Sequence, residues 1–138
     1  MRAPYTQLYV HLVWATWDRW PWLGPDLRPA VYSAIQAQAN GAGADIVAIG
    51  GMPDHVHVVT RFPTTISIAD LVRRLKGATS HLMTHEVRPG ESFRWQGGYG
   101  AFTVSRAVLP RVRDYVLNQE QHHGAGSLHA ALEATQEP

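Results

Sequence analysis

The chain has 138 residues, a formal net charge of +1 and 45% apolar residues. This length and composition predict one globular domain and exclude an intrinsically disordered chain. The absence of cysteine excludes disulfides, zinc–thiolate sites and cysteine nucleophiles. There is no apolar run of roughly 18 residues and no secretory signal pattern, so we expect a cytoplasmic protein with no membrane partner.

The first half of the chain predicts a strand, a helix and a second strand. Residues 5–17 are rich in aromatic and β-branched side chains, which is typical of a strand. Residues 27–39 carry apolar side chains at helical spacing, and residues 45–49 form a short apolar run that indicates another strand. Two glycines and a proline within residues 50–53 predict a turn.

The second half predicts two more strands and two more helices. Residues 56–62 form a strand, and Ser67 is a plausible N-cap for a helix that runs to about residue 86. Residues 101–105 predict the fourth strand. A last long helix is expected over residues 110–123, with a proline in its first turn.

The predicted order β-α-β-β-α-β-α is that of an α+β, ferredoxin-like (βαββαβ) fold with an additional C-terminal helix. Such a fold has an antiparallel sheet with two helices on one face, and its other face is free for a ligand or the extra helix. We predict one domain over residues 1–138, with a core of about 5–123 and a C-terminal tail of 124–138 that forms a short helix or stays mobile.

The most informative short pattern is His55-Val56-His57 at the start of a predicted strand. Strand side chains alternate between faces, so both imidazoles point the same way, about 7 Å apart along the strand, and can share one divalent cation. Asp54 is placed to support a ligating imidazole. His11 lies on the neighbouring strand, where we expect a structural histidine. The alternative for the pair is two partly buried histidines satisfied by hydrogen bonds.

The last predicted helix carries Tyr115 and Gln119 at i and i+4, so they share one face, which His122 and His123 continue. A tyrosine hydroxyl, with a free pKa of about 10, is a poor nucleophile unless a cation or a basic group lies nearby. A metal held by the two strand histidines would polarise a phosphate, and Gln119 offers an amide oxygen as a third ligand. The alternative is a half-buried tyrosine with its hydroxyl at the surface and a solvated glutamine.

These motifs together resemble the single-tyrosine transposases of small bacterial insertion sequences, which belong to the HUH nuclease superfamily. The matching stretches, in the family's order, are HLVWAT at 11–16, MPDHVHV at 52–58, LK at 75–76, WQGGYGAFTVS at 95–105 and YVLNQEQHH at 115–123.

The resemblance implies a homodimeric enzyme that excises and inserts its element as single-stranded DNA with imperfect hairpins near the ends. Mg²⁺ or Mn²⁺ would be held by His55, His57 and Gln119. Tyr115 would be the nucleophile that forms a 5′-phosphotyrosine and leaves a free 3′-hydroxyl. In the family the tyrosine helix can complete the active site of the partner subunit. Because the covalent linkage conserves the energy of the broken bond, no nucleotide cofactor is needed.

Eleven of the twelve basic residues are arginine, whose planar guanidinium binds phosphate in a bidentate manner, although a GC-rich genome gives the same bias. Basic residues that could line a DNA track are Arg61, Arg73, Arg74, Lys76, Arg94, Arg106, Arg111 and Arg113. Tyr99 could stack on an unpaired base, and Trp95 either stacks or packs under its loop. For Trp17, Trp20 and Trp22 we expect core or dimer contacts.

Three alternatives to the insertion-sequence transposase fit parts of the sequence less well. A histidine-triad nucleotide hydrolase needs a third alternating histidine, where this chain has Val59. A domesticated endonuclease associated with repetitive extragenic palindromes ranks second, but its tyrosine is typically followed by another aromatic residue and an Asn-Pro pair, which are absent. A non-catalytic ferredoxin-like nucleic-acid-binding module ranks third, because it would not need Tyr115 and Gln119 on the face of a metal site.

Overall fold

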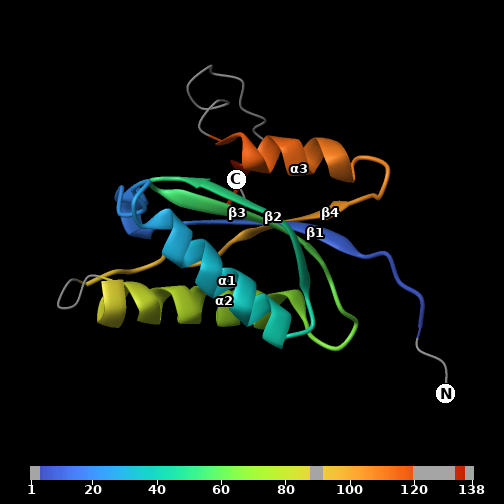
Figure 1. The fold of residues 1–138 in the computed structure, drawn as a ribbon, viewed down its shortest axis with the longest axis horizontal. Coiled ribbons are helices and arrows are strands. Elements are labelled where there is room, and N and C mark those ends of the chain that lie inside the picture. The colour runs from blue at the N-terminus through green and yellow to red at the C-terminus, as the bar shows by residue number, and fades with distance from the viewer. Residues whose placement is uncertain (1–3, 88–91, 120–132, 136–138) are drawn as a thin grey trace.

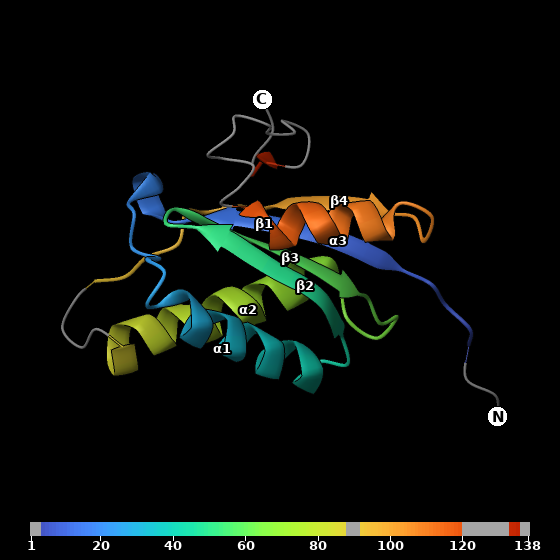
Figure 2. The ribbon, with the colours of Figure 1, turned by 45° about the horizontal axis from the view of Figure 1, so that its top comes forward.

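The structure is a computed structural model that describes residues 4–87, 92–119 and 133–135. A four-stranded sheet forms the middle layer, with α1 and α2 on one face and α3 on the other (Figures 1 and 2). The strands are β1 (Tyr9–Ala15), β2 (Asp45–Met52), β3 (His55–Arg61) and β4 (Gly100–Val104). The helices are α1 (Arg28–Gly41), α2 (Ile68–Leu82) and α3 (Leu109–Leu117), with a 3₁₀ turn η1 (Trp17–Arg19) and a π-helical turn η2 (Met83–Val87).

The sheet has the order β2-β3-β1-β4, and each neighbouring pair is antiparallel. This arrangement confirms the ferredoxin-like α+β fold with an additional C-terminal helix. None of the helices in the described ranges is long and apolar enough to cross a membrane. The prediction of one domain over 1–138 also covers residues outside these ranges and stays a prediction.

The two faces of the sheet follow from the alternation of side chains along the central strands. Val56 and Val58 of β3 lie with Leu12 and Trp14 of β1 in the main hydrophobic core, which α1 and α2 cover. The alternate residues of β3, which include both histidines, lie on the face that α3 covers. The valines and the histidines of β3 therefore lie on opposite faces of the sheet, as the alternation along the strand predicted.

Local signals explain where α2 begins. Ser67 is extended and its hydroxyl accepts a hydrogen bond from the backbone N–H of Asp70 at 3.1 Å, which confirms the predicted N-cap. The α-helical part ends at Leu82, four residues before the predicted end, and a π-helical turn continues the chain to Val87.

The predicted turn at residues 50–53 was partly wrong, because Gly50 and Gly51 belong to β2 and pair with His57 and Val56. Only Pro53 and Asp54 connect β2 to β3. The sequence suggested a turn because glycine usually weakens strands, but tertiary packing requires it here. A Cβ atom at Gly50 would lie 1.8 Å from the carbonyl oxygen of Val116, so the glycine lets α3 approach the sheet closely.

The tyrosine helix is regular over Leu109–Leu117, and the description of this segment continues to Gln119. Its apolar side packs on the sheet through Val116, which is buried with Ala48 of β2 and Val59 of β3. The predicted continuation of the helix to residue 123, with His122 and His123, lies outside the described residues, as does most of the predicted tail.

Candidate metal and tyrosine site

The two histidines of β3 lie side by side on the sheet face that α3 covers. His55 is paired across the strands with Ala15, and His57 with Val13. Both imidazoles are buried, with exposed fractions of 3% and 0%. Buried polar groups of this kind need partners, which here come from three separate parts of the chain.

Each imidazole is fixed through its Nδ1 atom. His55 Nδ1 lies 2.7 Å from a carboxylate oxygen of Asp54, and His57 Nδ1 lies 2.8 Å from Nε2 of His11. A partner at Nδ1 fixes the ring orientation and favours the tautomer whose Nε2 lone pair can bind a cation. The predicted supporting position of Asp54 is thus observed, and His11 lies at the histidine face as expected.

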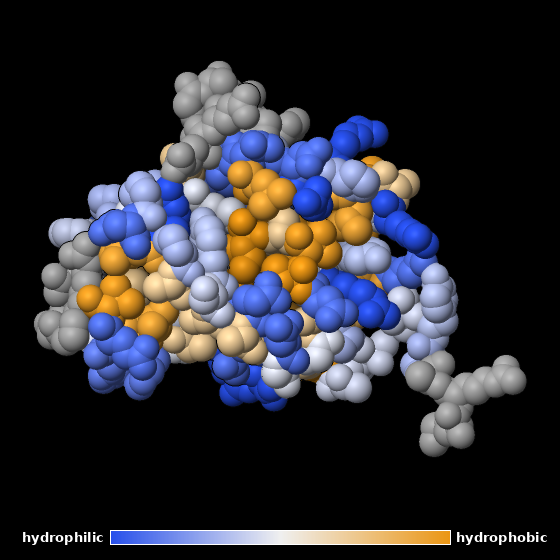
Figure 3. Space-filling view, in the orientation of Figure 1, coloured by the Kyte–Doolittle hydropathy of each residue, from blue (hydrophilic) through white to orange (hydrophobic). Residues whose placement is uncertain are grey.

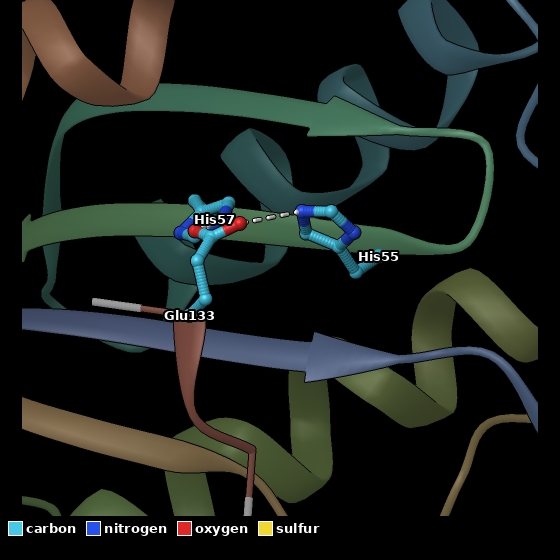
Figure 4. A group of neighbouring side chains, drawn as sticks. All are labelled: His55, His57 and Glu133. Atoms are coloured by element: carbon cyan, nitrogen blue, oxygen red, sulfur yellow. Dashed lines mark ion pairs between the residues drawn. The ribbon is translucent and has the colours of Figure 1, made fainter. Parts of the chain in front are cut away.

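Glu133 joins the two histidines from the C-terminal part of the chain (Figure 4). Its carboxylate oxygens lie 3.3 Å from Nε2 of His55 and 2.7 Å from Nε2 of His57. One donor atom from each of the three residues lies within 4.8 Å of the other two. Glu133 was not predicted from the sequence, because it lies far from the histidines along the chain and outside any recognisable motif.

The tyrosine helix brings two further groups to the same place. The amide oxygen of Gln119 lies 3.4 Å from His55 Nε2, while the amide nitrogen donates a hydrogen bond to the carbonyl of Tyr115 at 3.1 Å. The Tyr115 ring stands edge-on to His57, with 6.2 Å between centroids. Tyr115 and Gln119 therefore share a face as the i, i+4 spacing predicted, and they meet the histidines of their own chain.

Charge and burial set the protonation of this cluster. Burial alone would lower the pKa of His55, but its hydrogen bonds to Asp54 and Glu133 outweigh this effect and raise the pKa to about 9. Burial favours the neutral form of Glu133, yet the contacts with His55 and His57 hold its pKa well below the ordinary range. Burial and the neighbouring His57 lower the pKa of His11 to about 3, so His11 stays neutral.

The donor set fits a divalent cation. Two imidazole nitrogens, one carboxylate and one amide oxygen converge in a buried place, and Glu133 supplies a negative charge that offsets part of the ion's charge. Mixed nitrogen and oxygen ligands suit Mn²⁺ and related ions, and Mg²⁺ when phosphate oxygens complete the shell.

Most residues predicted to contact DNA lie away from this cluster. Arg73 and Arg74 are exposed on α2, on the opposite face of the sheet, and Arg73 pairs with Asp70 at 2.8 Å. Arg111 is exposed on α3, the helix of Tyr115. The DNA-contact roles of these arginines remain predictions.

The remaining predicted DNA contacts belong to the segment before β4. The Lys76 ammonium donates to the carbonyls of Gln96 at 2.7 Å and Gly98 at 3.1 Å, so it fixes this segment to α2. Tyr99 is partly buried against the main core, whereas Arg94 is exposed.

The aromatic residues separate into buried and exposed groups. Trp95 is 8% exposed, and its indole N–H donates to the Thr79 hydroxyl at 3.0 Å, so it packs under its loop. Trp22 packs against the main core, as expected. Trp17 and Trp20 are not part of the core, because they are 41% and 53% exposed.

Comparison with known proteins decides the family. Residues 4–119 match the family described as "Transposase IS200 like". The chain belongs to the IS200-like transposase family. This result confirms the resemblance that the sequence motifs indicated.

Individual relatives agree with this family. The ISDra2 transposase TnpA of Deinococcus radiodurans is 26% identical over 118 residues, which cover 82% of this transposase and 84% of the relative. The crystal structure of a candidate transposase from Deinococcus radiodurans is 27% identical, with a TM-score of 0.67 over 86% of this chain and 95% of that one. The structure of a REP-associated tyrosine transposase bound to a REP hairpin is 17% identical and shares the fold, with a TM-score of 0.68 over 90% and 73% of the two chains.

The site geometry also bears on the histidine-triad alternative. Val59, at the position where that class needs its third histidine, is fully buried beneath α3 with Ala48 and Val116. This position of the IS200-like transposase therefore forms part of the hydrophobic packing.

Proposed function

We propose that this transposase cleaves and rejoins single-stranded DNA through a 5′-phosphotyrosine on Tyr115, with a divalent metal ion held by His55 and His57. The observation that carries the proposal is the convergence of Tyr115, Gln119 and both histidines on one sheet face. A nucleic-acid-binding module would have no need for this convergence.

The chemistry exchanges one phosphodiester bond for another at the same phosphorus. Tyr115 provides the phenolic oxygen that attacks phosphorus, and its proton is lost as the phosphotyrosine bond forms. The bond from phosphorus to the 3′ oxygen breaks, and that oxygen takes up a proton to become a 3′-hydroxyl. Rejoining reverses these steps, so the number of phosphodiester bonds is conserved and no ATP is needed.

The metal ligands in this proposal are His55, His57, Gln119 and Glu133. A bound Mg²⁺ or Mn²⁺ supplies positive charge that polarises the scissile phosphate and stabilises the developing negative charge. Asp54 and His11 orient the imidazoles, and Gln119 is itself oriented by its bond to the Tyr115 carbonyl. Burial of the cluster strengthens each of these electrostatic interactions.

The substrate in this proposal is single-stranded DNA with hairpins near the ends of the element. The relationship to ISDra2 TnpA supports a transposon end as the substrate. The neighbour of the same fold bound to a REP hairpin supports a hairpin as the recognised form.

A covalent adduct tests the proposal directly. The protein is incubated with Mn²⁺ and hairpin DNA labelled at its 3′ end, the side of the cleaved bond that stays joined to Tyr115, then denatured and analysed by gel electrophoresis. We expect a labelled protein band that Tyr115→Phe abolishes and EDTA prevents, while DNA binding persists. Tyr9→Phe, at the far end of β1, is the matched control and should retain the band. An adduct that survives Tyr115→Phe would overturn the assignment.

We also propose that the protein acts as a homodimer. Apolar side chains gather on the face where β2, an edge strand, runs beside α3 (Figure 3). Val47 of β2 and Val112 of α3 are partly buried against the cluster of Ala48, Val59 and Val116, and Leu117 at the end of α3 is 50% exposed. Edge strands and exposed apolar patches of this kind are typical of subunit contacts. Sedimentation velocity should give a dimer that Leu117→Glu weakens, and a monomer at micromolar concentration would contradict this proposal.

A further inference from the structure

The turn after β1 carries features that the tyrosine and metal chemistry does not use. Residues 16–20, here called the tryptophan turn, expose the rings of Trp17 and Trp20. Asp18 and Arg19 inside it both have positive φ angles, 52° and 56°. Two successive non-glycine residues in this region are strained, and such strain persists where the surrounding structure enforces it, often at ligand sites.

The surrounding structure fixes the tryptophan turn on two sides. On one side, the backbone N–H of Thr16 donates to the Asp54 carbonyl at 2.9 Å, next to the first metal histidine. On the other side, the N–H of Trp17 donates to the Arg94 carbonyl at 2.9 Å, and the N–H of Asp18 donates to the Gln96 side chain at 3.2 Å. The exposed rings therefore stand on a turn that is hydrogen-bonded to the neighbouring segments on both of its sides.

Positive charge accompanies the exposed rings. The Arg94 guanidinium lies over the Trp17 ring, 4.0 Å from its centroid. Arg19 reaches Asp54 at 3.5 Å, and both side chains remain partly exposed. A pocket of about 480 Å³, lined by Arg19, Pro21, Asp54, His55 and Glu133 among others, connects the turn to the metal cluster.

We propose that the tryptophan turn is a stacking platform for unpaired bases of the single-stranded DNA next to the scissile phosphate. Bases stack on the exposed parts of the Trp17 and Trp20 rings, beside the Arg94 guanidinium that lies over Trp17, and Arg94 and Arg19 neutralise the flanking phosphates. Exposed aromatic rings interleaved with arginines form the arrangement that binds single strands without reading their sequence. The turn is continuous with the pocket at the metal cluster through Arg19, and this favours DNA rather than a protein as its partner. The inference rests on the proposed function, since the platform would bind the same DNA strand that the Tyr115 site cleaves.

The test measures binding of a fluorescent oligo(dT) 12-mer by anisotropy in EDTA, so that no cleavage occurs. We expect the Trp17→Ala/Trp20→Ala double variant to bind about tenfold or more weakly, and the Phe/Phe double variant to bind nearly as well as the parent. Tyr5→Ala is the matched control, because Tyr5 is 85% exposed and precedes β1, at the end of that strand away from the turn. An abasic oligonucleotide should bind the parent weakly and should not distinguish parent from the Ala/Ala variant.

Arg94→Met should also weaken binding and reduce the steepness of its salt dependence by about one phosphate contact. Equal affinity of the parent and the Ala/Ala variant for oligo(dT), with both folded by thermal unfolding, would overturn the platform. A parent dimer that becomes monomeric in the Ala/Ala variant would assign the turn to a subunit contact instead and would also overturn it.

The covalent-adduct assay separates this inference from the proposed function. If the parent forms the Tyr115 adduct but its DNA affinity does not depend on the two rings, only the platform fails. If the rings are needed for oligo(dT) binding but no adduct forms with Mn²⁺, the proposed chemistry fails and the platform stands.

Discussion

Gly50→Ala gives the sharpest test of how the sheet positions the tyrosine helix. The added Cβ would lie 1.8 Å from the Val116 carbonyl oxygen and 2.8 Å from its carbonyl carbon. Ordinary contact begins at 3.4 Å, so this part of α3 must move outward by about 1.6 Å. Gly50 does not have a positive φ angle, so the backbone itself accepts alanine and the effect comes from the collision alone.

The outward movement should separate Tyr115 and Gln119 from the histidines. Misplacing a reacting group by about 1 Å can lower a rate about 100-fold, so we expect adduct formation to fall by about that factor. Overpacking at a buried contact should also lower the free energy of unfolding by about 1–3 kcal/mol. Adduct formation is followed in single-turnover time courses with Mn²⁺, and stability by urea denaturation.

Gly77→Ala is the matched control, because no atom lies within 4 Å of its added Cβ and the residue is within α2. It should leave the rate unchanged and stabilise the protein by up to about 1 kcal/mol. If Gly50→Ala cleaved DNA at the parent's rate, α3 would not act from the position it has in this structure, and the assignment of Tyr115 to the histidines of its own chain would be refuted.

Three further outcomes follow from the site. Glu133→Gln should lower Mn²⁺ affinity about tenfold in calorimetry, because a ligand charge is lost, and equal affinity would remove Glu133 from the ligand set. In EDTA, His55 stabilises the fold fully below its ordinary pKa of 6.5, and this contribution, on the order of 3 kcal/mol, is lost as the pH rises through about 9. The melting temperature should therefore fall between pH 6 and pH 10, and it should fall less in His55→Asn. If the melting temperatures of the parent and His55→Asn fell equally with pH, His55 would not be the cause. Lys76→Met should lower the free energy of unfolding by about 1–2 kcal/mol with little effect on DNA affinity, because its ammonium holds two carbonyls. If Lys76→Met left the free energy of unfolding unchanged but weakened DNA binding, Lys76 would instead be assigned to a phosphate contact.

The sequence contained enough local information for the order of elements and for the placement of His55 and His57. Alternation of side chains put His55 and His57 on one face and the valines beside them on the other, and helical spacing put Gln119 beside Tyr115. These inferences held because the periods of strand and helix are fixed by backbone geometry, whatever the rest of the fold does. The N-cap at Ser67 was predictable for the same reason, since it depends only on nearby residues.

Other features depended on contacts between distant segments. Gly50 and Gly51 looked like a turn, and only the close approach of α3 explains why a strand carries glycine there. Glu133 had no local signal at all, because an isolated acidic residue acquires its role only from the imidazoles it meets. The two carbonyl partners of Lys76 lie 20 and 22 residues away in the sequence, so no local pattern indicated them, and its predicted phosphate contact stays a prediction.

The sequence by itself determined the fold class, the family resemblance and the facing of the two histidines, because each depends on order, motif or a short-range period. The tertiary structure alone showed that the Tyr115 ring stands edge-on to His57, that Glu133 contacts both histidines, and that Trp17 and Trp20 stay exposed. Which side chains meet across a sheet, or remain outside its core, depends on how distant segments pack, and no local pattern records that packing.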